Sequence, residues 1–262
     1  MSIATVLGTE LLKLRRSRIT WITFAVYAAM AAVAGLFQWM MKDPSAARTL
    51  GLMGQKATLA FGGQPVDWPT FLGFIVEMGG LGGLLMSAVI AAWVFGREYA
   101  EGTAKNMLAL PVPRWHFVAA KIVVCALWLG LLTAWMLAAA VIAGALIQLP
   151  GLTASVLAFT AGRLFGLAAM CLACAPLVAW VAVQTRGYFG PLGFAIGTLV
   201  LASVFGHTGW GPWVPWSIIG LCSGAAGPVT GLGAGSAAVV AGTFVLGTAL
   251  TLGHEMGADN AQ

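Results

Sequence analysis

The residue types that catalyse reactions or hold metal ions are few in this sequence, and they are scattered. The three histidines, His116, His207 and His254, lie near the ends of different apolar runs, so they cannot converge on one metal ion. His254 is followed by Glu255, but the second histidine of a zinc-protease helix is missing. We therefore expect no metal site and no catalytic residue, and an enzyme is the weakest of the functional hypotheses.

Redox chemistry and nucleotide hydrolysis are also disfavoured. Cys171 and Cys174 have the spacing of a redox or zinc pair, but no second such pair and no neighbouring histidine accompany them. We interpret them as small apolar side chains within a helix. The phosphate-binding pattern G-x-x-x-x-G-K-[ST] does not occur, so the chain has no nucleotide-hydrolysing site of that kind.

Charge is concentrated in residues 95–121, FGREYAEGTAKNMLALPVPRWHFVAAK, which two apolar runs flank. Gly102 breaks the preceding helix, and the hydroxyl of Thr103 can cap a new one. Pro111 cannot continue that helix, so one short helix is expected at 104–110.

The short helix carries apolar surface between charged flanks. Met107 and Leu108 lie on it, and Glu98, Glu101 and Arg114 lie outside it. A short helix of this kind can dock into the groove of a partner protein. The alternative is that it lies flat on a membrane.

The overall composition is that of a membrane protein. The chain has 262 residues, of which 60% are hydrophobic and only 8% charged, with a mean hydropathy of +0.93. A soluble domain of this size would need far more charge on its surface. The net charge of +5 does not indicate nucleic-acid binding, because the basic residues lie beside apolar runs.

Six apolar runs are each long enough to cross a bilayer at about 20 residues per crossing. They predict an all-α integral membrane protein with a single transmembrane domain over 1–262, and spans near 19–41, 71–95, 118–148, 154–183, 188–206 and 232–253. Residues 96–117 form the charged loop between spans two and three.

The lysines and arginines predict the orientation of these spans. With six crossings, one side collects nine of them and the other side collects three, namely Lys42, Arg48 and Lys56. Basic loops stay in the cytoplasm. Both termini and the charged loop are therefore expected to be cytoplasmic.

Residues 1–18 are expected to form an amphipathic helix at the inner membrane interface, with its basic end near lipid headgroups. Glu10 falls within the apolar face of this helix. It either pairs with Lys13 three residues later or contacts a partner protein.

Two ionisable residues lie inside predicted spans, Glu77 in the second and Arg163 in the fourth. A charge in a bilayer is costly, so such residues face a bundle interior or a water-filled path. We expect Glu77 and Arg163 to approach one another or to line one outward cavity. Either a structural ion pair or a substrate pathway would explain them.

The segment 207–231 is rich in glycine, proline and tryptophan, and it leaves two interpretations open. Its tryptophans suit anchoring at a membrane boundary. The segment could instead be partly re-entrant and form an outer gate.

Taken together, the motif residues resemble the signature loop of type-two ATP-binding-cassette exporter permeases, most closely the antibiotic-resistance and peptide-immunity branch that includes bacitracin permeases. The residues that resemble this loop are Glu98-x-x-x-Gly102-Thr103, Leu108-x-x-Pro111-x-x-Arg114 and Lys121. The pattern of six spans is also similar to the family, so the resemblance covers essentially the whole chain. Pro113 departs from the family, which commonly has a small hydroxyl residue there.

The resemblance implies a subunit in the inner (plasma) membrane that pairs with a second permease, identical or related, and with two cytoplasmic ATPase subunits. ATP and magnesium would bind to the ATPases, and this chain would hold no cofactor. The residues expected to couple this subunit to the ATPases are Glu98, Glu101, Gly102, Thr103, Met107, Leu108, Pro111 and Arg114. Glu98, Glu101 and Arg114 would fix the angle of the short coupling helix or meet the rim of the ATPase.

The function implied is ATP-driven export of an amphiphilic or hydrophobic substrate, such as a peptide antibiotic, a drug or a lipid. The alternative is a membrane anchor or sensor that recruits a cytoplasmic partner and transports nothing.

Overall fold

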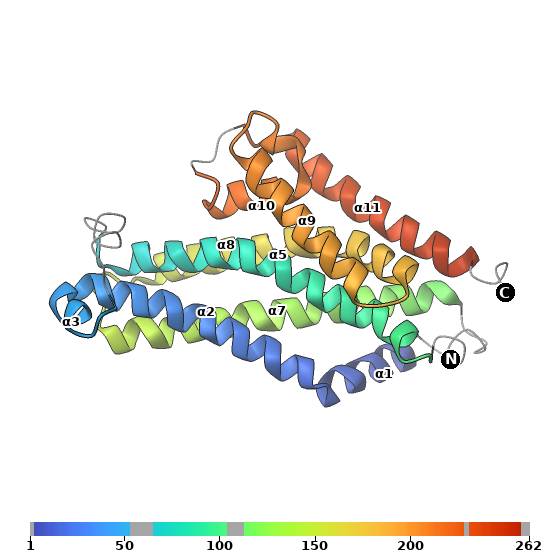
Figure 1. Cartoon of the computed structure of the whole chain (residues 1–262), viewed down its shortest axis with the longest axis horizontal. Coiled ribbons are helices and arrows are strands. Elements are labelled where there is room, and N and C mark those ends of the chain that lie inside the picture. Colours follow the sequence, from blue (N-terminus) through green and yellow to red (C-terminus); the bar gives the residue numbers. More distant parts are fainter. Residues whose placement is uncertain (1–2, 53–64, 104–112, 228–230, 258–262) are drawn as a thin grey trace.

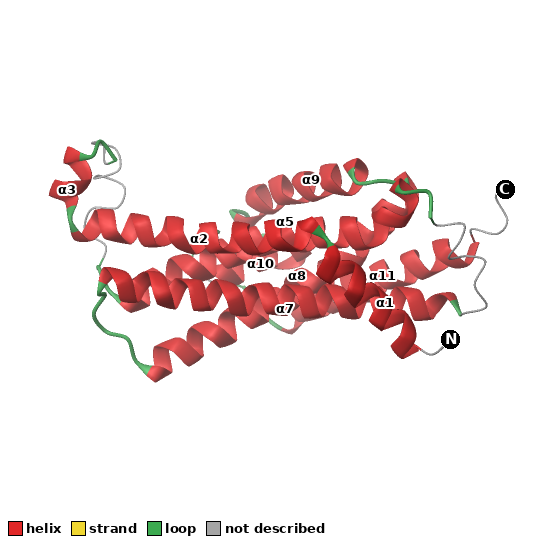
Figure 2. Ribbon diagram, turned by 90° about the horizontal axis from the view of Figure 1, so that it is seen from below, coloured by secondary structure: helices red, strands yellow, loops and turns green. Residues whose placement is uncertain are grey.

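The computed structural model describes residues 3–52, 65–103, 113–227 and 231–257, and every regular element within these ranges is helical (Figures 1 and 2). Six of the helices are long and apolar enough to cross a membrane: α2 (Arg18–Lys42), α5 (Trp68–Ala100), α7 (Arg114–Ile147), α8 (Ala154–Thr185), α9 (Phe189–Gly206) and α11 (Ala234–Gly257). The predicted all-α membrane fold with six spans is confirmed.

Four shorter elements complete the described chain. They are α1 (Ile3–Arg16), α3 (Pro44–Thr49), the 3₁₀ turn η1 (Gly211–Trp213) and α10 (Pro215–Ser223). The two chain ends lie at the same end of the bundle, and α3 lies at the opposite end (Figure 1). The helix α1 is thus at the end where the C-terminus lies.

Side chains at the helix starts explain where the spans begin. Ser17 accepts a hydrogen bond from the Ile19 amide at the start of α2, and Asp67 accepts one from the Thr70 amide at the start of α5. Thr153 caps α8 in the same way through the Val156 amide. Each cap satisfies an amide that has no partner within the helix.

The helix α5 is the central element of the bundle. Its buried residues occur all along its length, and it packs against α2, α7, α8, α9 and α10. With 33 residues it is about 50 Å long, which exceeds the hydrocarbon thickness of about 30 Å. Its ends therefore extend past the hydrocarbon.

The loop between α5 and α7 is shorter than we expected. The sequence placed it at 96–117, but α5 continues to Ala100 and α7 begins at Arg114. The onset of charge marks the end of the hydrocarbon, whereas a helix can continue into the polar region while its charged side chains find partners. The short helix expected at 104–110 lies outside the described residues.

Within the segment 207–231, the described residues up to 227 fold back onto the bundle. The short helix α10 packs against α5, α8 and α9, and Ser217 to Leu221 are buried. Trp210 and Trp213 in contrast are exposed, at 69% and 60%. The tryptophans therefore fit the anchoring interpretation, while α10 is held by the bundle.

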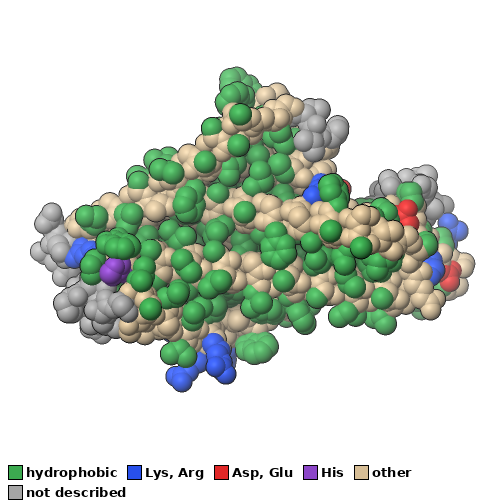
Figure 3. Space-filling view, turned by 180° about the vertical axis from the view of Figure 1, so that it is seen from behind, with side chains coloured by type: hydrophobic (Ala, Val, Ile, Leu, Met, Phe, Trp, Pro, Cys, Tyr) green, Lys and Arg blue, Asp and Glu red, His purple; other side chains and the backbone are tan. Residues whose placement is uncertain are grey.

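Hydrophobic side chains are spread over the face of the molecule in Figure 3, as expected for contact with lipid. Trp21, Leu146 and Phe159 are among the exposed ones. Exposed apolar area on this scale would be a liability in water and is normal for a face that meets acyl chains.

The helices α8 and α11 approach closely at Gly247. A Cβ atom built on this glycine would lie 2.6 Å from the backbone nitrogen of Leu177 and 2.8 Å from the carbonyl carbon of Pro176. Thr251, one turn later, donates its hydroxyl to the Pro176 carbonyl oxygen at 3.1 Å. Only glycine permits this approach.

Gly247→Ala is expected to destabilise the protein by about 1–3 kcal/mol, because the added methyl group pushes α11 off the backbone of α8. The matched control is Gly242→Ala on the same helix, where a Cβ would meet nothing within 4 Å. The unfolding temperatures of the two purified variants in detergent measure the difference. Equal unfolding temperatures for the two variants would contradict this packing.

Candidate functional site

Glu98, at the end of α5, is the centre of a buried charge cluster. Its side chain joins three helices: Oε1 accepts from Lys13 Nζ of α1 at 3.0 Å, and Oε2 accepts from Lys121 Nζ of α7 at 2.6 Å. Lys13 also pairs with Glu10 Oε1 at 2.5 Å. We call these four residues the Glu98 cluster.

The Glu98 cluster is balanced in charge, with two carboxylates and two ammonium groups. Glu98 is only 6% exposed, Glu10 5% and Lys121 3%. Such charges are costly to remove from water unless each is paired. Burial lowers the pKa of Lys13, but the charges of Glu98 and Glu10 more than offset this and raise its pKa above the usual value.

The expected i,i+3 pair between Glu10 and Lys13 is formed, which explains a carboxylate on the apolar face of α1. The contact of Lys13 with Glu98 was not expected, since the two residues are 85 positions apart. It attaches α1 to the rest of the bundle.

The helix α5 ends in the way that glycine usually ends helices. Gly102 has a φ of +69°, the Gly102 amide donates to the Tyr99 carbonyl, and the Thr103 amide donates to the Glu98 carbonyl at 2.9 Å. These two bonds form a Schellman motif. The predicted helix break at Gly102 is thus present, and the hydroxyl of Thr103 points back to the Glu98 carbonyl at 3.4 Å.

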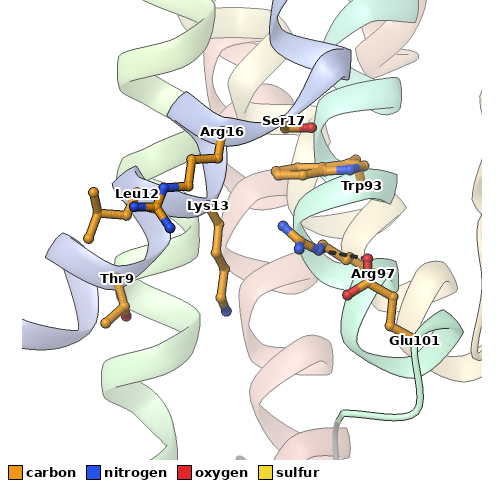
Figure 4. Close-up of a pocket in the computed structure, with 8 residues that line it drawn as sticks. All are labelled: Thr9, Leu12, Lys13, Arg16, Ser17, Trp93, Arg97 and Glu101. Carbon is orange, nitrogen blue, oxygen red and sulfur yellow. Dashed lines mark hydrogen bonds and ion pairs between the residues drawn. The ribbon is translucent and has the colours of Figure 1, made fainter.

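Glu101 forms a more exposed pair on the same helix. Its Oε1 accepts from Nε of Arg97 at 2.9 Å, and the Arg97 guanidinium lies 5.1 Å from the centre of the Trp93 ring (Figure 4). The side chain of Glu101 is 50% exposed, so it remains accessible to another protein, whereas Glu98 does not.

The last turn of α11 fastens both helices that flank the loop. Tyr99 of α5 donates its hydroxyl to Glu255 Oε1 at 3.0 Å. Arg114, the first residue of α7, donates to the carbonyl oxygens of Glu255 and Met256. A guanidinium at a helix C-terminus compensates the partial negative charge of the carbonyls there.

The helix ends on both sides of residues 104–112 are therefore attached to neighbouring helices, and we call this set of contacts the frame. The helix before them is held to α1, α7 and α11, and the helix after them is held to α5 and α11. Of the predicted coupling residues, Glu98, Glu101, Gly102, Thr103 and Arg114 lie in this frame. Met107, Leu108 and Pro111 lie outside the described residues.

Tyr99 and Glu255 belong to the frame, and the sequence did not indicate them. Glu255 follows the last apolar run in a part of the chain that carries no recognisable motif. Tyr99 directly follows the motif residue Glu98 but is itself not part of the pattern. Only the position of α11 beside the loop reveals both.

Glu77 and Arg163 form no ion pair with one another, and they line two different cavities. Arg163 donates through one guanidinium nitrogen to the carbonyl oxygens of Cys222 at 3.1 Å and Ser223 at 3.4 Å, at the C-terminal end of α10. The reason is that α10 folds back and brings its unpaired terminal carbonyls within reach of α8. These acceptors could not be read from side-chain types.

Glu77 instead borders a cavity of about 520 Å³ between α2 and α5. Within the described ranges, Glu77 has no hydrogen-bond or ion-pair partner. The walls of the cavity are otherwise almost entirely apolar, and its larger side chains are Met30, Phe37, Met41, Phe74, Met78 and Leu81.

No group of three or more potential metal ligands occurs in the part of the chain that the structure describes. Cys125, Cys171 and Cys174 are buried free thiols, and burial fits their interpretation as apolar side chains.

Comparison with known proteins gives two findings. The sequence profile of the family described as ABC-2 family transporter protein matches residues 6–202, about three quarters of the chain. The bacitracin transport permease protein BCRB of Bacillus licheniformis is 38% identical over 77 residues, which are 29% of this chain. That match spans 36% of the length of the relative.

Glu98→Gln is expected to cost about 3–5 kcal/mol of stability, because Lys121 stays buried without a counter-charge. Glu101→Gln is the matched control and should cost less than about 1 kcal/mol, since its ion pair is exposed. Reaction of the buried cysteines with a thiol dye during heating measures both.

The double variant Glu98→Gln/Lys121→Met distinguishes the cost of an unpaired buried charge from the cost of lost side-chain packing. It removes both buried charges, so it should be more stable than Glu98→Gln alone. A double variant as unstable as the sum of its single changes would contradict the buried pair.

Proposed function

The chain belongs to the ABC-2 transporter family, and from this premise we propose that it is the transmembrane subunit of an ATP-driven exporter of amphiphilic or hydrophobic compounds. The family consists of transmembrane subunits, so the ATPase of such a transporter is a separate chain. We infer two cytoplasmic ATPase subunits, which hold ATP and magnesium, and a second permease that is identical or related.

The proposed placement is the inner (plasma) membrane, with both termini and residues 101–113 in the cytoplasm. The basic residues support this orientation. Most of them lie before α2, around the α5–α7 loop and at Arg186 after α8. In this orientation the Glu98 cluster lies on the side from which an ATPase would approach.

The observation that carries the proposal is the frame around residues 104–112. When the ATPases close around ATP, they would displace this loop. The contacts of the frame would transmit that displacement to α1, α5, α7 and α11 together. If the helix ends that flank the loop had no such contacts, the same displacement would move the loop alone and leave the helices in place. Rotation of the whole bundle could then open an outward path.

The frame supports different roles for its charged residues. Glu98 is buried with both oxygens paired, which suits a residue that fixes the angle of α5. Glu101 is half exposed and suits contact with the ATPase rim. Arg114 ties the exit of the loop to α11.

Substrate class follows from the Glu77 cavity. Its apolar walls suit an acyl chain or the apolar face of a peptide, and its one carboxylate suits a cationic group. The Bacillus licheniformis relative is a bacitracin transport permease, so bacitracin is the first compound to test.

Arg114→Gln should leave the ATPase bound to the permease but reduce the stimulation of ATP hydrolysis by substrate. Coupling free energies are about 1–3 kcal/mol, so the loss should be at least about fivefold. The control is Arg15→Gln, which removes an exposed cationic charge from α1, at the same end of the bundle. Co-purification and ATPase assays in lipid vesicles measure both steps.

One outcome would count against the exporter, and another would count only against the proposed role of Arg114. An ATPase that co-purifies but never responds to any amphiphile would favour the anchor or sensor. Wild-type stimulation in Arg114→Gln would mean that the tie to α11 does not transmit the push.

Glu77→Gln should weaken stimulation by cationic amphiphiles by about tenfold or more, because a charge-assisted contact contributes about 1.5–3 kcal/mol. Neutral amphiphiles of the same chain length should stimulate the variant and the wild type equally. A dose–response series with paired cationic and neutral compounds decides this. Equal losses for both kinds would assign Glu77 to the structure of the permease and not to recognition.

A further inference from the structure

A second pocket lies at the inner end of the bundle, where α1 turns into α2 (Figure 4). Its volume is about 460 Å³. α1 contributes Lys13 and Arg16, the junction contributes Ser17, and α5 contributes Trp93 and Arg97. We call it the junction pocket.

Arg16 is the unbalanced charge of the junction pocket. It makes no hydrogen bond or ion pair with any residue that the structure describes. Figure 4 shows its guanidinium beside Lys13 and Leu12, on the α1 side of the pocket.

Carboxylates near the junction pocket are already used. Glu10 and Glu98 neutralise Lys13 and Lys121, and Glu101 neutralises Arg97. Arg16 therefore leaves the pocket with a positive charge, which Arg15 and Arg18 on either side reinforce. An anion is the complementary ligand.

The donors come from both sides of the pocket: the Arg97 guanidinium points from α5 toward α1, and Arg16 lies on the α1 side (Figure 4). Arg97 donates to Glu101 through Nε only, so its two terminal nitrogens can still donate to a ligand. Ser17 accepts from the Ile19 amide at 3.3 Å, and its own hydroxyl hydrogen has no acceptor among the described residues. Two guanidinium groups and a hydroxyl form a suitable set for a phosphate group.

The surroundings of the pocket favour lipid over a soluble anion. Ser17 is the N-cap of a spanning helix, so the pocket lies where the hydrocarbon begins. The adjacent side chains Leu12, Trp21 and Ile22 are 53%, 73% and 59% exposed and offer apolar surface to acyl chains. Tryptophan is enriched at this depth.

We propose that the junction pocket binds the phosphate of an anionic phospholipid from the cytoplasmic leaflet, with Arg16 as its main ligand. The inference rests on the proposed cytoplasmic orientation. The bound headgroup bridges α1 and α5, so lipid occupancy supports the same attachment of α1 that Lys13 makes through Glu98.

The experiment titrates the purified permease in detergent with phosphatidylglycerol and follows bound lipid by native mass spectrometry and unfolding by heating. Arg16→Gln is compared with Arg15→Gln, which removes the same charge one residue away but does not line the pocket. Neither change breaks a contact given by the structure, so both variants should fold.

In the wild type and in Arg15→Gln we expect one tightly retained phosphatidylglycerol and a raised unfolding temperature. Arg16→Gln should bind at least about fivefold more weakly, since a basic residue near anionic lipid contributes that much. Phosphatidylcholine and inorganic phosphate should have little effect on any of the three.

Three results would overturn the proposal. Equal weakening in Arg15→Gln and Arg16→Gln would mean a diffuse electrostatic attraction without a pocket. Equal binding of phosphatidylcholine would mean that charge is not recognised. Equal stabilisation by inorganic phosphate would assign the site to a soluble anion. None of these measurements needs transport or an ATPase. The lipid site can therefore be refuted without refuting the exporter, and the exporter without refuting the lipid site.

Discussion

The carboxylate of Glu98, shared between two lysines, is the interaction on which the end of the bundle that carries α1 depends. One oxygen holds α1 and the other holds α7, while the helix that carries them is α5. In a low-dielectric environment such a group is held in place because every alternative leaves a charge without a partner. Apolar contacts alone would let these helices slide, since lipid competes for the same surface.

Backbone carbonyls are the second constraint on the bundle. Helix ends inside or near a membrane expose acceptors that water cannot satisfy. Two arginines meet this need: Arg114 at the end of α11 and Arg163 at the end of α10. The same residue type therefore performs one task at both helix ends.

The sequence predicts the six spans because each is a long apolar run, and it predicts the break at Gly102 because glycine readily adopts a positive φ. It also identifies Glu98 through its motif. It does not predict the contacts of Glu98, since Lys13 lies 85 residues away and spacing carries no information at that range. The Arg163 contact was missed for another reason, because its acceptors are backbone atoms that every residue possesses.

A single uninterrupted helix connects the two ends of the molecule. Glu77 and Glu98 both lie on α5, which has no proline after its first turn. At about 1.5 Å per residue they are separated by roughly 31 Å along a stiff rod. The helix is thus a lever: a tilt of about 5° at the Glu98 end displaces Glu77 by roughly 3 Å over that length. A small movement of the charged end is enough to change the width of the distant cavity.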